Sequence, residues 1–382
     1  MAKLIYLDNA ATTPLDESLV KKTHKLISTS YGNPSSIHQI GKLARQSLEK
    51  ARKNIADSIG ADPEEVIFTS GGTESNNLAI KGFAEANPEK KHIICSMIEH
   101  PSVIEVCREL EKKGYSVDYI SVDKNGIVDL DELKQRINSN TLLVSIMHVN
   151  NEIGTIQPIE EIGKICKSRN IPFHTDVVQS FGKLKIDVKK TNISMLSASG
   201  HKLNAPKGIG ILYINKNLKI KPLFDGGGQE KNLRSGTENT MGAIFLASAL
   251  GIKRPTNKIL KSRNQLIKEL LKIKGAILNG DSEKRIPNNI NISFYGIEGE
   301  SLSLMLDKEG ICVSTGSACS SHKLQESHVL KAIGVDPLYI HGSIRLSLDS
   351  RKPLSAQEIK FIATKFRENV EKLRKISPFK LQ

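Results

Sequence analysis

Strand-like and helix-like patterns alternate between residues 16 and 250, and this alternation constrains the fold more than any other feature. An apolar run at residues 66–70 precedes a helical pattern at 73–86, and similar pairs recur as far as residue 214. Strands that alternate with helices in this way build a parallel sheet with helices on both faces. The sequence therefore predicts an α/β fold whose main sheet is mostly parallel.

The pattern changes after about residue 250. A charged helical stretch at 257–274 leads into short strands and a long basic amphipathic helix at 355–375. This mixture is typical of a smaller α+β domain. We expect a large domain of residues 16–250. The first 15 residues are too short to fold alone, so we expect a small domain formed by residues 1–15 with 251–382.

The composition narrows the setting in which the protein works. No apolar run of 18 residues exists, which predicts no membrane-spanning helix. The N-terminus lacks the longer apolar core of a secretory signal. The five cysteines are odd in number and form no CxxC pair, which favours reduced thiols in the cytoplasm.

The net charge of +14 is strongly basic. A basic surface that keeps the protein soluble is the simplest interpretation. Long-range attraction to an acidic protein partner or to an RNA substrate is the sharper one. The lysines are scattered and no RNA-binding signature is present, so the charge does not choose between the two partners.

Residues 199–208, with the sequence SGHKLNAPKG, place Lys202 directly after His201 in a loop of small residues. A lysine that attacks a carbonyl must lose its proton, which free lysine holds to about pH 10.4. A cramped, partly desolvated loop with nearby cations lowers that pKa. Lys202 is therefore the candidate for a Schiff base with pyridoxal phosphate (PLP).

The turn at residues 70–75, SGGTES, lies between a predicted strand and a predicted helix. Its glycines, including Gly72, let the backbone approach a phosphate, and the new helix offers free N–H groups. Thr73 adds a hydroxyl. Taken alone, the turn is better explained as a helix start capped by Thr73, with Glu74 in the first helical turn.

Two further strand ends carry polar residues. Asp176 ends a strand at the edge of the sheet where α/β proteins bind ligands. A carboxylate there suits the pyridine nitrogen of PLP, although helix capping explains a lone aspartate equally well. Gln179 is close enough to reach the phenolic oxygen of the same ring. Asn151, in the sequence MHVNNEIG at 147–154, is a candidate for hydrogen bonding to substrate or cofactor.

His100 and Cys319 complete the set of candidates. Pro101 fits the first turn of a helix, so His100 projects from the strand–helix junction, where it could stack on a cofactor ring. A lone histidine at such a place is more often a loop residue. Cys319 lies among glycine, serine and alanine in an exposed type of loop, as a reactive thiol requires. The other four cysteines fit core positions.

Together these motifs resemble a cysteine desulfurase of the class V aminotransferase-like PLP family. The resemblance covers nearly the whole chain and includes, in order, the sequences YLDNAATTP, GNPSS, GGTES, MHVNNEIG, SGHK, RSGTEN, GSAC and GSIR. It implies a PLP-dependent aminotransferase type I fold and a homodimer. It also implies an activity that takes sulfur from L-cysteine, releases L-alanine and leaves a persulfide on the enzyme.

The resemblance implies roles for individual residues. Lys202 carries the cofactor and moves protons, and His100 stacks on the ring. Asp176 pairs with the ring nitrogen, and Gln179 bonds the phenolic oxygen. The family pattern favours Lys202 over Lys207 as the Schiff-base lysine. The phosphate is held by Gly72, Thr73, Ser199, His201 and, from the neighbouring subunit, Thr237.

The remaining implied roles concern the substrate and the sulfur. Asn151 and Arg345 hold the substrate carboxylate, for which a guanidinium is well suited. Cys319 accepts the sulfur. The segment from Cys319 to His328 is not shortened, which resembles the long-loop housekeeping type. The C-terminal extension that many such relatives use to contact a scaffold is not seen.

Several partners and alternatives follow from the same resemblance. The sulfur acceptor is expected to be a protein such as an iron–sulfur scaffold, or proteins of tRNA thiolation. No metal and no membrane are expected. A selenocysteine lyase or a small-amino-acid aminotransferase of the same fold is the alternative, although transamination needs no thiol. A non-catalytic sulfur carrier with this fold is a third hypothesis, which Lys202, Asp176 and His100 argue against.

Overall fold

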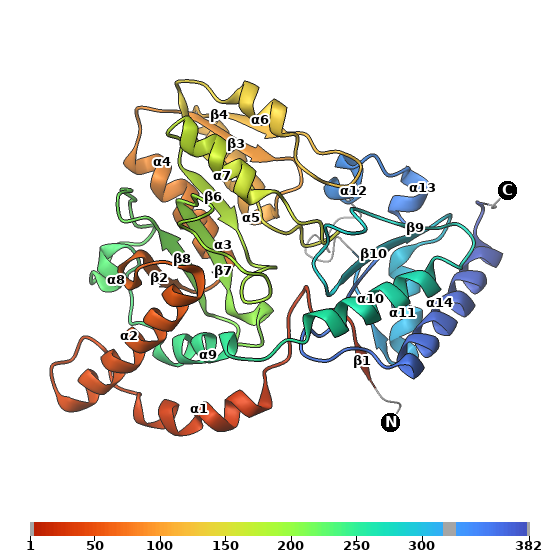
Figure 1. Ribbon diagram of the computed structural model, residues 1–382, viewed down its shortest axis with the longest axis horizontal. Helices are drawn as coiled ribbons and strands as arrows, with labels where there is room; N and C mark the ends of the chain where they lie inside the picture. Colours follow the sequence, from red (N-terminus) through yellow and green to blue (C-terminus); the bar gives the residue numbers. More distant parts are fainter. Residues whose placement is uncertain (1–3, 316–325, 380–382) are drawn as a thin grey trace.

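The computed structural model describes residues 4–315 and 326–379 (Figure 1). Within these ranges, the larger sheet has seven strands in the order β2-β8-β7-β6-β5-β3-β4. Their bounds are Val66–Thr69 (β2), His92–Ser96 (β3), Ser116–Ile120 (β4), Thr141–Ser145 (β5), Phe173–Asp176 (β6), Met195–Ser199 (β7) and Gly210–Ile214 (β8). Only β8 runs against its neighbours β2 and β7, and the pairs from β7 to β4 are parallel. This arrangement confirms the mostly parallel α/β sheet.

Neighbouring residues of one strand point to opposite faces of this sheet, where they enter two different cores. Ile93 belongs to one apolar cluster and Ile94 to the other, because successive side chains of a strand alternate. One face is covered by α3, α4 and α5, and the other by α2, α6, α7 and α9. The bounds are Gln39–Ile59 (α2), Gly72–Asn77 (α3), Phe83–Ala86 (α4), Pro101–Lys112 (α5), Leu130–Arg136 (α6), Ile159–Ser168 (α7) and Thr240–Leu250 (α9).

A separate apolar core, distinct from the two on the faces of the large sheet, belongs to the C-terminal part of the chain. It joins apolar residues between positions 259 and 370 to Ile5 and Leu7. In Figure 1, β1 accordingly lies beside the C-terminal elements. These elements are Ile5–Tyr6 (β1), Thr256–Leu270 (α10), Ala276–Leu278 (β9), Asn289–Phe294 (β10), Gly299–Lys308 (α11), Ile311–Cys312 (β11), His328–Ala332 (α12), Pro337–Ile340 (α13), Ser343–Ser347 (β12) and Ala356–Ile376 (α14). We propose domain boundaries at residues 15 and 250 on this basis.

Some local features differ from the sequence-based expectations. The helix expected at 73–86 is interrupted by a π-helical turn, Leu78–Gly82, between α3 and α4. The apolar run at residues 141–149 forms a strand only as far as Ser145, and the chain then turns toward the cavity described below. Cys312, expected in the core, is partly exposed on β11. In the described ranges, no helix has the length and apolar character needed to cross a bilayer.

A buried ion pair fixes the loop that carries Thr237 to the large domain. Glu230, in the short helix α8 (Gln229–Asn232), accepts two hydrogen bonds of 2.8 Å from the guanidinium of Arg52 on α2. The same carboxylate accepts a 2.8 Å bond from the backbone N–H of Phe68. Both side chains are almost fully buried. A buried pair of this kind is costly to break, because Arg52 would keep only the surface carboxylate of Glu49 as an ionic partner.

We predict that Glu230→Ala lowers the free energy of unfolding by about 3–5 kcal/mol, since Arg52 is left charged in the interior. The matched control is Glu49→Ala, because Glu49 contacts the same guanidinium from the surface with 46% of its side chain exposed. That change is expected to cost about 0–1 kcal/mol. Urea unfolding of the two variants measures the difference, and equal losses would contradict the prediction.

Candidate active site

A cavity of about 260 Å³ opens at the carboxyl ends of the strands of the large sheet. It gathers residues that are up to 335 positions apart, because residues 10 and 345 both reach it. Its lining includes every candidate that the structure describes except Thr237. The lining residues are Ala10, Ala11, Gly72, Thr73, His100, Ser102, Met147, Val149, Asn151, Asp176, Val178, Gln179, Ser199, His201, Lys202 and Arg345.

Lys202 ends a short 3-10 turn that directly follows β7. Its Nζ donates hydrogen bonds of 2.6 Å and 2.5 Å to the backbone carbonyls of Ala10 and Ala11. These carbonyls belong to the segment that follows β1. The amine is therefore oriented in the cavity by the start of the chain.

Asp176 is buried at the end of β6, with 6% of its surface exposed. One carboxylate oxygen accepts a 2.8 Å bond from the backbone N–H of Val178, and the other accepts a 2.8 Å bond from Asn76 Nδ2. Asn76 Nδ2 also donates to Ser102 Oγ, which lies 2.8 Å from His100 Nδ1. A chain of polar contacts thus connects Asp176 to His100.

The surroundings of His100 favour the uncharged form of its ring. Burial is the largest cause of its lowered pKa, and the positive charges of Lys202 and Arg345 lower the pKa further against the opposing effect of Asp176. Nδ1 accepts a hydrogen bond from the backbone N–H of Ser102 at 3.1 Å. The neutral ring therefore carries its proton on Nε2.

The end of the cavity near α3 is suited to an anion. A Cβ atom on Gly72 would lie 2.6 Å from Val178 Cγ2, so only glycine fits there. The hydroxyl groups of Thr73 and Ser199 come from α3 and from the end of β7. His201 completes this end, and burial, with the charges of nearby lysines, lowers its pKa to about 4.

These residues fit PLP in two respects. Hydroxyl groups, a histidine and the backbone at Gly72 lie at one end, as a phosphate requires. A carboxylate held by neutral donors, Asp176, lies elsewhere in the same cavity and suits a protonated ring nitrogen. Gln179 donates one amide hydrogen to the carbonyl of Ala10 at 3.1 Å, which leaves its second hydrogen for a ring substituent.

Arg345 projects from β12 into the cavity and is already partly paired. Its Nη2 lies 3.0 Å from Asp8 Oδ1, and its Nη1 donates to the backbone carbonyl of Asn151 at 3.1 Å. Its Nε is buried and has no hydrogen-bond partner among the described residues. Two of the five N–H groups of the guanidinium are thus engaged, and an anion that binds Arg345 in the cavity has to compete with Asp8 for it.

Cys319 lies outside the described residues, as does most of the expected long loop. The residues on either side of it are described and approach the cavity. Ser314 exchanges backbone hydrogen bonds of 2.7 Å and 3.2 Å with Arg345. On the other side, His328 Nε2 donates to the carbonyl of Glu99 at 3.0 Å, next to His100.

Two buried acids near the cavity were not among the sequence-based candidates. Burial raises the pKa of Glu99 to about 8, although Ser96 Oγ and the backbone N–H of Met147 both donate to its carboxylate. Burial also raises the pKa of Glu152, which accepts a 2.6 Å bond from Ser327 Oγ. Each of the two glutamates follows an apolar strand in the sequence, and this pattern could have indicated that both are buried near the cavity.

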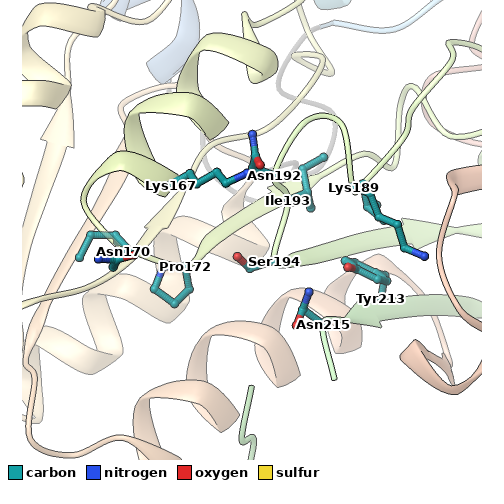
Figure 2. Close-up of a pocket in the computed structure, with 11 residues that line it drawn as sticks. Lys167, Asn170, Pro172, Lys189, Asn192, Ile193, Ser194, Tyr213 and Asn215 are labelled. Carbon is teal, nitrogen blue, oxygen red and sulfur yellow. The ribbon is translucent and has the colours of Figure 1, made fainter. Parts of the chain in front are cut away.

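A larger cavity, of about 470 Å³, lies at the other end of the strands β6, β7 and β8 (Figure 2). Lys167 and Asn192 lie at one side of it, and Lys189 and Tyr213 at the other. Lys189 is paired with Asp62 at 3.0 Å. Among the residues that the structure describes, no carboxylate, histidine or cysteine lines this cavity. The sequence-based candidates converge instead in the smaller cavity, at the edge where α/β proteins bind ligands.

The chain resembles known proteins over nearly its whole length. The model of the aminotransferase class-V family matches residues 5–353. A cysteine desulfurase IscS of Methanosarcina thermophila is 50% identical over 98% of this chain and 94% of its own length. A cysteine desulfurase of Nostoc sp. is 46% identical over 99% of this chain and 95% of its own.

Solved structures give the same result. A NifS-like protein superposes with a TM-score of 0.90 at 37% identity, covering 97% of this chain and all of its own. A structure described as SspA in complex with cysteine has a TM-score of 0.82, also at 37% identity, over 91% of this chain and 99% of its own. The chain therefore belongs to the aminotransferase class-V family and, within it, to the cysteine desulfurases.

Proposed function

We propose that this protein is a PLP-dependent cysteine desulfurase, which converts L-cysteine to L-alanine and leaves a persulfide on Cys319. One observation carries the proposal. The cavity joins Lys202, Asp176 and His100, and the described residues on both sides of the Cys319 segment contact the surroundings of the same cavity.

Different residues of the cavity bind different parts of the cofactor. When bound, PLP supplies the electron sink that makes the α-carbon of an amino acid acidic. Asp176 would hold the ring nitrogen, His100 would stack on the ring, and Gln179 and Asn151 would contact its edge. Gly72, Thr73, Ser199 and His201 would hold the phosphate. Lys202 Nζ is the amine that would carry the cofactor and take the proton from the α-carbon of the substrate.

The substrate is held by its carboxylate and attacked at its sulfur. The guanidinium of Arg345 and the amide of Asn151 bind the carboxylate. The Cys319 thiolate then forms an S–S bond with the substrate sulfur while the bond between that sulfur and the β-carbon breaks. The released carbon takes up a proton and leaves as alanine. Cysteine and the enzyme thiol thus give alanine and the enzyme persulfide, with no other reactant needed.

We also propose that the active protein is a homodimer. Thr237 is exposed and does not line the cavity, as expected of a residue that contacts the phosphate of a neighbouring subunit. Large apolar side chains are exposed in two parts of the chain. Phe224 and Met241 lie within about 15 positions of Thr237 in the sequence, and Tyr31 and Ile37 lie on the segment between α1 (Glu17–Thr29) and α2. Ile37 is 89% exposed. A second subunit is a natural cover for such side chains.

The acceptor of the sulfur is proposed from the relatives and the charge. Relatives named IscS make an iron–sulfur scaffold the first candidate, and tRNA-thiolation proteins the second. A net charge of +14 favours an acidic acceptor surface in either case. The protein is expected to act in the cytoplasm, where the thiol of Cys319 stays reduced.

We predict that Lys202→Ala abolishes the visible absorption band of covalently bound cofactor, because no other lysine among the described residues lines the cavity. Lys207→Ala is the matched control, since Lys207 is exposed on the same loop. The control is expected to keep the band. Absorption spectra of the purified variants with added PLP decide the matter, and a persistent band in Lys202→Ala would refute the assignment.

We predict that Cys319→Ser keeps the cofactor spectrum but lowers alanine release from L-cysteine by at least about 100-fold, as expected for loss of a nucleophile. Cys312→Ser is the control, because Cys312 lies on β11 beside Asp307 and does not line the cavity. Mass spectrometry after incubation with labelled cysteine locates the persulfide. Alanine release at the wild-type rate from Cys319→Ser would favour another reaction of this fold.

A further inference from the structure

The start of α12 contacts two turns of the large domain, and each of these turns carries a residue that lines the active-site cavity. The His100 turn (residues 97–100) follows β3 and ends at His100, and the Asn151 turn (residues 149–153) comes a few residues after β5. α12 lies at the boundary between the large domain and the C-terminal elements (Figure 1). Connecting segments keep one conformation only where other groups hold them.

The His100 turn is held through two successive backbone carbonyls. The carbonyl of Ile98 accepts a 2.8 Å hydrogen bond from Asn150 Nδ2. The carbonyl of Glu99 accepts a 3.0 Å bond from His328 Nε2. His100 comes directly after these carbonyls, and α5 begins at the next residue. The position from which the His100 ring enters the cavity therefore depends on the bond from His328.

The Asn151 turn is held through a buried carboxylate. Glu152 has 5% of its surface exposed, and its carboxylate accepts a 2.6 Å bond from Ser327 Oγ. A carboxylate removed from water needs donors, and a hydroxyl bond to it is among the stronger hydrogen bonds of proteins. Ser327 is the N-cap of α12, and its Oγ also accepts a 3.1 Å bond from the backbone N–H of Leu330. Asn151 is thus next to a residue fixed to the start of α12.

A small apolar cluster surrounds these polar contacts. It joins one isoleucine from each turn to apolar side chains of α12 and the residues after it, namely Ile98, Ile153, Val329, Leu330, Ile333 and Ile340. Its buried members belong to none of the other three cores. Apolar attraction has no preferred direction, whereas hydrogen bonds do. The cluster therefore supplies the attraction, and the bonds from Ser327 and His328 set the register of the two turns.

We propose that Ser327 and His328 are positioning residues of the active site, which hold His100 and Asn151 in place through the turns that carry them. Neither Ser327 nor His328 lines the cavity, so both act through other residues. The inference rests on the proposed function for the roles of His100 and Asn151. Small displacements of groups that contact the reacting molecules are costly in rate, because productive alignment is lost.

The first test measures the visible circular dichroism of bound PLP, which reports how the ring lies in its surroundings. His328→Leu and Ser327→Ala are expected to lower the band per bound cofactor. His328→Gln keeps a donor near the position of Nε2, and Ser327→Thr keeps the hydroxyl, so both are expected to show the wild-type band. His341→Leu is the matched control, because His341 is half exposed and pairs with Glu326 instead of with either turn.

The second test asks whether each residue acts through the group assigned to it. In a protein that already carries His100→Gln, adding His328→Leu is expected to leave the dichroism unchanged, because the ring that His328 positions is absent. Ser327→Ala is expected to have no further effect in a protein that carries Asn151→Ala. Equal changes with and without these first substitutions would show that α12 affects the whole fold instead, and would overturn the proposal.

The third test measures alanine release from L-cysteine per bound cofactor. His328→Leu and Ser327→Ala are each expected to lower kcat/KM by about 3- to 10-fold, the loss expected for one hydrogen bond. A role in stability alone would lower the amount of bound cofactor and leave this ratio unchanged.

These tests separate the inference from the proposed function. If wild-type protein binds PLP but releases no alanine from L-cysteine, the proposed function fails, and the dichroism of bound PLP still tests the positioning roles. A lowered band in His328→Leu and Ser327→Ala, restored in His328→Gln and Ser327→Thr, supports these roles. Wild-type dichroism in both His328→Leu and Ser327→Ala would overturn them.

Discussion

The carboxylate of Asp176 is the point from which the geometry of the active site is set. A buried carboxylate must be surrounded by donors, and here both donors are neutral and firmly held. One is the backbone N–H of Val178, and the other is Asn76 on α3. Because Asn76 also contacts Ser102 at the start of α5, a central strand and two helices are held in register around one charge.

The sequence allowed the layout of the main sheet to be predicted but not the direction of every strand. Runs such as residues 93–95 are apolar without interruption because both faces of the sheet are covered, and this pattern is typical of buried parallel strands. The run at residues 210–214 looks the same, yet β8 is antiparallel. Whether a strand is parallel or antiparallel to its neighbours depends on the length and path of the connection before it. The apolar run itself carries no information about that connection.

Most of the candidates found from the sequence stand in a motif at the end of a strand or the start of a helix, whereas Arg345 lies in the middle of β12. Asn76 was missed because its importance comes from Asp176, 100 positions away. Glu99 and Glu152 were missed because their ordinary preference is for the surface, and only the folded chain shows that they are buried. Thr237 is a different case, since its expected partner is in another subunit.

The first residues of the chain connect two functions of the site. Asp8 pairs with Arg345, and two and three positions later the carbonyls of Ala10 and Ala11 orient the amine of Lys202. If Arg345 holds the substrate carboxylate, as proposed, that carboxylate competes with Asp8, and a shift of Asp8 would move the carbonyls that follow it. Recognition of the substrate and alignment of the Lys202 amine would then be mechanically linked through one short segment.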